Sequence, residues 1–168
     1  MKPSQAVRAA QAPGHSQAQA PPWLGLASRV ALGSVLVLAG TLKAGSPAEE
    51  FAVVIESYRI VPQDMALTLA AFLPWAELLA GYSLILGYLT RQAALASGAL
   101  LAGFIAALLS ARLRGIELPH CGCFGAGWHP SPDLTLLMDL GLAALAALSF
   151  RSGARRLSLD NWVERVGR

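Results

Sequence analysis

The sequence predicts an all-α protein, an integral membrane bundle of four helices with one short extracytoplasmic helix at the interface. Of its 168 residues, 55% are hydrophobic and only 14% are charged, which is a smaller charged share than soluble domains usually carry. Four apolar segments approach the ~20 residues that a helix needs to cross about 30 Å of hydrocarbon. These segments are residues 23–42, 66–89, 93–113 and 134–150.

Two tails flank the predicted membrane domain at residues 23–150. Residues 1–22 are rich in Ala, Gln and Pro and lack the apolar core of a cleavable signal peptide, so we expect a disordered cytoplasmic tail there. Residues 151–168 place Leu, Trp and Val among arginines, which predicts a basic amphipathic cytoplasmic tail suited to an anionic inner leaflet. The other basic residues form no basic face, which argues against nucleic-acid binding.

The positions of lysine and arginine predict the orientation of the bundle. With a cytoplasmic N-terminus, nine of the 13 Lys and Arg side chains fall on the cytoplasmic side: Lys2, Arg8, Arg29, Arg91, Arg151, Arg155, Arg156, Arg165 and Arg168. The others, which fall outside, are Lys43, Arg59, Arg112 and Arg114. The positive-inside rule therefore places both termini in the cytoplasm. We expect Arg29 and Lys43 to extend to opposite membrane interfaces from the two ends of the first span.

A short helix is predicted between the first two spans, in the segment "SPAEEFAVVIESYRIVP". Ser46 would be its N-cap, Pro47 its first residue and Glu49 the partner in a capping box. The apolar residues that fall on one face are Phe51, Val54, Ile55 and Tyr58. This pattern indicates a helix that lies in the interface or roofs the bundle. An ordinary surface connector is the alternative.

Two carboxylates lie inside the predicted spans, Glu77 in the second and Asp139 in the fourth. An ionised acid at the centre of a spanning helix costs ~2.5–3.5 kcal/mol even on a lenient scale, so each should face the bundle interior. At ~1.5 Å per residue, Glu77 lies about 18 Å and Asp139 about 8 Å below the outer face. These depths predict a polar core or proton relay that leads inward. The alternative is that each acid only hydrogen-bonds a neighbouring helix.

Two further features of the spans concern packing. Pro74 should kink the second span. The third span carries small residues at every fourth position, which lets another helix approach closely in lipid. These residues are Ala94, Gly98, Ala102, Ala106 and Ser110.

The two cysteines of the chain, Cys121 and Cys123, lie in the segment "HCGCFG", which we expect on the outer face. Extended residues two apart have Cα atoms ~6.6 Å apart, close to the limit of ~6.8 Å for a disulfide. Gly122 permits a tighter turn, and the small strained ring would be easily reduced, as catalytic disulfides are. The basic residues that would favour the thiolate are His120, Arg112 and Arg114.

Three other readings of the cysteine pair are weaker. Inert structural thiols should lie within a span, and Cys121 and Cys123 do not. A structural disulfide would close too short a loop to stabilise the fold. Zinc could be bound together with His120 and His129, but the Cys-x-Cys spacing is cramped for a zinc site. We therefore predict a catalytic redox pair and no metal site.

Five segments of the chain together resemble the MauE/DoxX family of redox-associated membrane proteins. They are "LASRVALGSVLVLAGTLK", "ESYRIVP", "LPWAELLAGYSLILG", "LRGIELPHCGCFG" and "MDLGLAALA", within residues 26–150. The resemblance implies a four-helix bundle of the bacterial inner membrane that supports disulfide chemistry outside the cytoplasm. In that family, MauE is required for maturation of the disulfide-rich small subunit of methylamine dehydrogenase, and relatives accompany thioredoxin-like proteins. By position, it implies roles for Glu77, Cys121, Cys123 and Asp139.

We therefore predict a membrane-embedded thiol–disulfide redox protein, acting as an oxidoreductase accessory on a thioredoxin-like partner or a client protein at the outer face. Generators of the DsbB and vitamin K epoxide reductase type relay electrons between two cysteine pairs, and this chain has one. A quinone in the bundle or further proteins would have to complete the path. The alternative is a non-catalytic subunit or assembly factor of a larger membrane complex.

Overall fold

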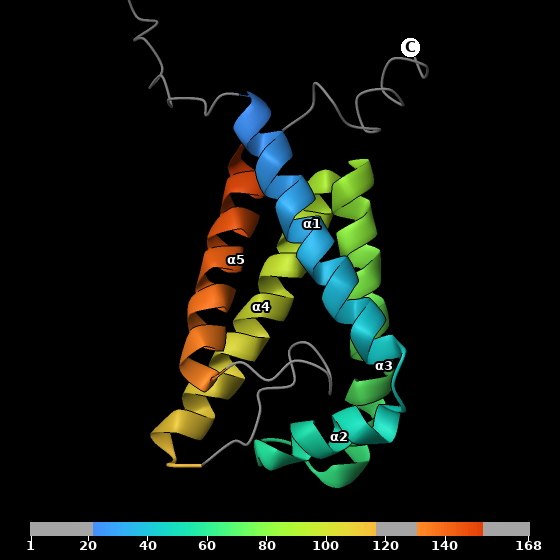
Figure 1. Ribbon diagram of the computed structural model, residues 1–168, viewed down its shortest axis with the longest axis vertical. Helices are drawn as coiled ribbons and strands as arrows, with labels where there is room; N and C mark the ends of the chain where they lie inside the picture. Colours follow the sequence, from blue (N-terminus) through green and yellow to red (C-terminus); the bar gives the residue numbers. More distant parts are fainter. Residues whose placement is uncertain (1–21, 117–130, 153–168) are drawn as a thin grey trace, which may run out of the picture.

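Five α-helices make up the part of the chain that the computed structural model describes, residues 22–116 and 131–152 (Figure 1). They are α1 (Pro22–Ala44), α2 (Ala48–Ser57), α3 (Gln63–Leu86), α4 (Thr90–Leu113) and α5 (Pro132–Ser152). These residues contain no strand, so the predicted all-α class is confirmed. The two predicted tails, apart from the residues that α1 and α5 include, lie outside the described residues.

Four of the helices, α1, α3, α4 and α5, are long and apolar enough to cross a membrane. All four predicted spans are therefore confirmed, although both ends of the second span and the start of the third were placed three residues too late. The second span ends at Leu86 because Gly87 adopts a left-handed conformation, with φ of 70°, and stops the helix. The chain then turns back, and α4 begins at Thr90.

The bundle carries many large apolar side chains on its outside and several charged ones in its interior. Leu79 and Phe72 are 71% and 69% exposed on α3, whereas Glu77 on the same helix is 1% exposed. A soluble protein would show the opposite distribution. The exposed apolar surface is suited to lipid, and the fold is that of a multi-pass membrane protein.

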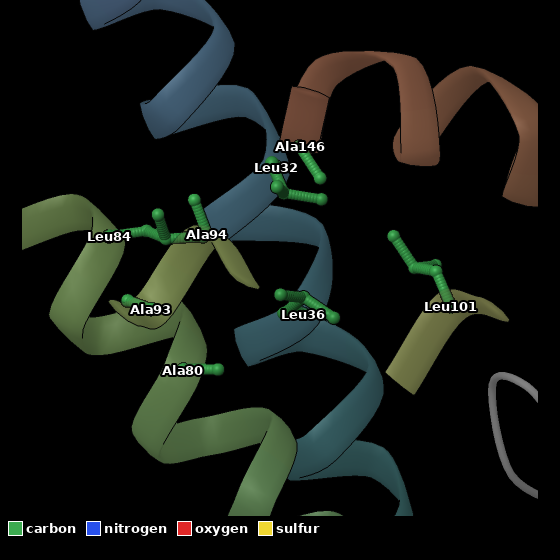
Figure 2. Packing of buried hydrophobic residues seen from close by; sticks show 8 residues of the cluster. All are labelled: Leu32, Leu36, Ala80, Leu84, Ala93, Ala94, Leu101 and Ala146. Carbon is green, nitrogen blue, oxygen red and sulfur yellow. The ribbon is translucent and has the colours of Figure 1, made fainter. Parts of the chain in front are cut away.

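The interior of the bundle is formed by small residues and leucines from all four spans (Figure 2). The central cluster consists of Leu32, Leu36, Ala80, Leu84, Ala93, Ala94, Leu101 and Ala146. Beside it, α1 and α3 touch through glycines: a Cβ built on Gly81 would lie 2.8 Å from the carbonyl oxygen of Gly33. This close approach, absent from our sequence-based expectations, fixes α1 against α3.

The small-residue stripe predicted on α4 is used only in part within the bundle. Ala94 is buried in the central cluster, but Ala102 and Ala106 are exposed. A Cβ built on Gly98 would have no described atom within 4 Å. Most of the stripe therefore points away from the helices that the structure describes.

Helix α2 lies across the end of the bundle opposite the start of α1 and the end of α5 (Figure 1). Its predicted apolar face is turned inward: Phe51 and Tyr58 are buried, and Val54 and Ile55 pack beside them. The predicted cap is wrong, because Pro47 takes the N-cap position and no side chain caps the helix. The roofing role is confirmed, and we call α2 the roof helix below.

We expect Gly81→Ala to destabilise the fold by about 1–3 kcal/mol, because the added methyl group would force α1 and α3 apart. Thermal unfolding in detergent micelles measures the change. The matched control is Gly98→Ala on α4, where a Cβ meets open space and should leave the unfolding temperature unchanged or slightly raised. Equal stability of the two variants would contradict a close α1–α3 contact.

Candidate functional site

A lysine and a glutamate form an ion pair in the interior of the bundle. The Nζ of Lys43, near the end of α1, lies 2.5 Å from Oε1 of Glu77 in the middle of α3, and both side chains are 1% exposed. Glu77 thus faces the interior, as predicted. The prediction for Lys43 is wrong, because the carboxylate holds its ammonium inside the bundle instead of leaving it at the outer interface.

The backbone of α1 and α3 makes this contact possible. Gly40 lies one turn before Lys43, and a Cβ built there would lie 2.9 Å from the carbonyl oxygen of Pro74 and 3.2 Å from Cβ of Glu77. Since glycine has no side chain, the last turns of α1 can approach the turn of α3 that carries the carboxylate. The helix α3 continues through Pro74 without a break.

Two phenylalanines complete the described surroundings of the Lys43 ammonium. Its Nζ lies 5.4 Å from the ring centroid of Phe51 on α2 and 5.1 Å from that of Phe104 on α4. Both distances are within the range of a cation–π interaction. Oε2 of Glu77 is buried and has no hydrogen-bond partner among the described residues. The site thus joins four helices around one charge pair and leaves one oxygen free to accept a proton.

Asp139, the second carboxylate expected in the core, is buried on α5 with 4% of its surface exposed. Its neighbour Met138 packs in the cluster that contains Tyr58 of the roof helix and Leu108 of α4. Asp139 therefore faces the interior, as predicted. Its role in a proton relay stays a prediction.

The roof helix, the C-terminal end of α4 and the N-terminal end of α5 are joined by the contacts of two arginines. Arg112 at the end of α4 forms an ion pair with Asp133 in the first turn of α5. Arg114 donates hydrogen bonds to the carbonyl oxygens of Tyr58 and Arg59 at the end of α2, at 3.0 Å for Arg59. These contacts fix the helix ends between which residues 117–130 run.

The predicted catalytic residues Cys121 and Cys123, together with His120 and His129, lie outside the described residues. Their redox role stays a prediction. The described partners of Arg112 and Arg114 are a carboxylate and backbone carbonyls, so the structure shows an anchoring function for both arginines. Within residues 22–116 and 131–152, no group of three or more His, Cys, Asp and Glu side chains could hold a metal ion.

A second buried polar region lies toward the start of α1. Arg29 is 1% exposed, so the expectation that it extends to the interface is also wrong. Beside it, the hydroxyl groups of Ser28 and Ser149 form a buried hydrogen bond of 3.1 Å between α1 and α5. Sequence reasoning placed Glu77 in the interior but missed the burial of Lys43 and Arg29, because it treated each cation of α1 as a residue at the membrane interface. The sequence signal that could have indicated their burial is a charged residue inside a segment that is otherwise apolar enough to span the membrane.

Comparison with known proteins gives two matches for the chain. Residues 21–152 match the family model described as Methylamine utilisation protein MauE. The Methylamine utilization protein MauE of Paracoccus denitrificans is 36% identical over 114 residues, which cover 67% of this chain and 61% of that protein. The chain thus matches less than two thirds of the length of this curated relative. No solved structure matches the chain significantly.

We expect Lys43→Met to lower the stability of the protein by about 3–5 kcal/mol, because it leaves the Glu77 carboxylate buried without its partner. The double variant Lys43→Met, Glu77→Leu should recover most of this loss, since it removes both charges and keeps the volume similar. Unfolding in detergent micelles measures both. The control is Arg112→Met, which breaks an exposed ion pair and should cost no more than about 1 kcal/mol. Similar losses for Lys43→Met and the control would contradict a buried pair.

Proposed function

The chain belongs to the MauE family, and from this premise we propose that it is a membrane-embedded accessory protein that matures an extracytoplasmic partner by thiol–disulfide exchange. The Paracoccus denitrificans relative is a methylamine utilization protein, as its name states. We take that process as the setting of this chain too. The family membership is the observation that carries the proposal.

Cys121 and Cys123 are the proposed reacting groups. One thiolate attacks a sulfur of a partner disulfide and releases one partner thiolate, which leaves a mixed disulfide. The second cysteine of the pair then attacks that bond and releases the other partner thiolate. The partner has gained two electrons and the pair has become a disulfide, and the reverse sequence oxidises the partner. A thioredoxin-like protein or a client under maturation fits this exchange.

The described residues on either side of the cysteine segment are packed on the bundle. Ile116, immediately before the cysteine segment, packs in the cluster that contains Tyr58 of the roof helix. At the other end of the segment, Asp133 is paired with Arg112. Both described ends of the segment are therefore attached to the bundle at the end where the roof helix lies.

The proposed orientation puts the roof helix and the ends of the cysteine segment outside the cytoplasmic membrane of a bacterium, with both termini inside. Disulfides persist in that outer compartment. Figure 1 shows the start of α1 and the end of α5 together at one end of the bundle and α2 at the other. The described cations near the proposed inner end include Arg91, whose guanidinium lies 4.7 Å from the ring centroid of Phe150.

Glu77 and Asp139 are the proposed polar core that accompanies the exchange. Oxidation of two thiols to a disulfide releases two protons and two electrons. Because the chain has one cysteine pair, an electron acceptor outside that pair is required, either a quinone or a further thiol protein. The buried carboxylates are the groups within the spans that can take up protons.

A second candidate function is that of a non-catalytic subunit or assembly factor in a larger membrane complex. One observation favours it: part of the small-residue stripe on α4 has no described neighbour, since Ala102 and Ala106 are exposed and a Cβ built on Gly98 would meet no described atom within 4 Å. Small residues of this kind let a helix of another protein approach closely in lipid.

Trapping experiments distinguish the two functions. We expect Cys121→Ser or Cys123→Ser to accumulate a covalent adduct with a partner protein on non-reducing gels, because one cysteine alone cannot resolve the mixed disulfide. The double variant should form no adduct and should not support maturation of the partner. The amount of membrane protein should stay constant in all three, since so short a loop hardly stabilises the fold.

The matched control is Ser110→Ala near the end of α4, which removes a hydroxyl group but leaves both thiols in place. Its maturation activity should equal that of the unaltered protein. Full maturation in the double cysteine variant would sink the redox proposal and leave the non-catalytic subunit in its place.

A further inference from the structure

The Lys43 ammonium links the buried carboxylate of α3 to the roof helix. It lies 2.5 Å from Oε1 of Glu77 and 5.4 Å from the ring of Phe51, which is itself buried beneath the N-terminal half of α2. The charge on Glu77 therefore affects the contacts of the roof helix through the side chain of Lys43. The length and flexibility of the lysine stem allow the ammonium to occupy a second position.

We propose that Lys43 and Glu77 form a proton-controlled latch that holds the roof helix α2 on the bundle. A proton from the outer aqueous phase binds Oε2 of Glu77, the buried oxygen that has no described hydrogen-bond partner, and a neutral carboxyl group results. The ammonium then lacks its counter-ion in an apolar interior, and two ring faces offset only part of that loss. Because Lys43 is one residue from the end of α1, its ammonium moves to the nearby interface and leaves Phe51.

The contacts at the two ends of the roof helix decide how it opens. At its C-terminal end, Arg114 on α4 donates hydrogen bonds to the carbonyl oxygens of Tyr58 and Arg59, and Glu77 plays no part in them. In its N-terminal half, Phe51 and Ala52 pack on α3 through apolar contacts, and Lys43 adds a cation–π contact with the Phe51 ring. Loss of the latch therefore frees the N-terminal half of α2, while Arg114 keeps the other end as a hinge.

Other charged groups lie on the helices packed around the pair, and the test must separate them from Glu77. They are Arg29 on α1, Glu49, Glu50 and Glu56 on α2, Asp64 on α3, Arg91, Arg112 and Arg114 on α4, and Asp133, Asp139 and Arg151 on α5. The three glutamates of α2 are exposed or half-buried, whereas Asp139 is, besides Glu77, the buried carboxylate among the described residues. The proposal predicts that protonation of Glu77, and of none of these other acids, releases the N-terminal half of α2.

Hydrogen exchange of the backbone amides of α2 tests the latch without any thiol chemistry. The full chain in lipid nanodiscs is compared with Glu77→Gln, which mimics the protonated carboxyl group, and with the double variant Lys43→Met, Glu77→Gln. We expect exchange in the N-terminal half of α2 to be on the order of tenfold faster in Glu77→Gln. The double variant should regain slow exchange, because the uncharged Met side chain can stay in the apolar interior beside Phe51, whereas the unpaired ammonium leaves it.

The unaltered protein supplies the second measurement, which does not depend on a variant that folds. After correction for intrinsic rates, exchange in α2 should rise as the pH falls, and this rise should persist in Asp139→Asn and in the triple variant Glu49→Gln, Glu50→Gln, Glu56→Gln. Ser149→Ala, which breaks a buried hydrogen bond far from the roof, should leave α2 unchanged. A pH-independent α2, or equally fast exchange in the single and double variants, would overturn the latch.

Discussion

A charge inside a lipid-facing bundle must find its partner within the protein, and this constraint organises the structure. Lys43 and Glu77 satisfy each other only because α1 and α3 approach closely, and Gly40 is the residue that permits the approach beside them. The cation then draws Phe51 of the roof helix and Phe104 of α4 around it. The electrostatic requirement of one buried pair thus helps to determine how four helices meet.

Close packing stabilises the association of helices in lipid, where the hydrophobic effect does not drive helices together. Hydrocarbon chains are as apolar as leucine, so association depends on backbone proximity and on polar contacts. The structure uses both: Gly33 faces Gly81 across α1 and α3, and the hydroxyl groups of Ser28 and Ser149 join α1 to α5. The large apolar residues, such as Leu79 and Phe72, are left for the lipid.

Sequence reasoning predicts the elements of this fold better than their contacts. The four spans, the roof helix and the inward position of Glu77 follow from apolar length, periodicity and the cost of an unpaired acid. The partner of Glu77 could not be predicted, because Lys43 lies 34 positions away and only the packing of two helices shows which cation is near. The outward turn of most of the α4 stripe has a similar cause: small residues show where a helix can approach, and the packing decides which helix does. The cysteine pair lies outside the described residues, so its role rests on sequence and family alone.

The position of Lys43 at the end of α1 also bears on how the protein is made. The ribosome completes α1 well before it reaches Glu77, so the lysine enters the membrane before its counter-ion exists. Because Lys43 lies near the end of the span, its long side chain can place the ammonium at the interface until α3 inserts, at a low cost in free energy. Burial of the charge must then follow the arrival of α3, and the roof helix, which lies between the two in the sequence, can settle only afterwards. The same residue that ends as a core contact therefore begins as a surface anchor, and its placement gives membrane insertion a fixed order of assembly.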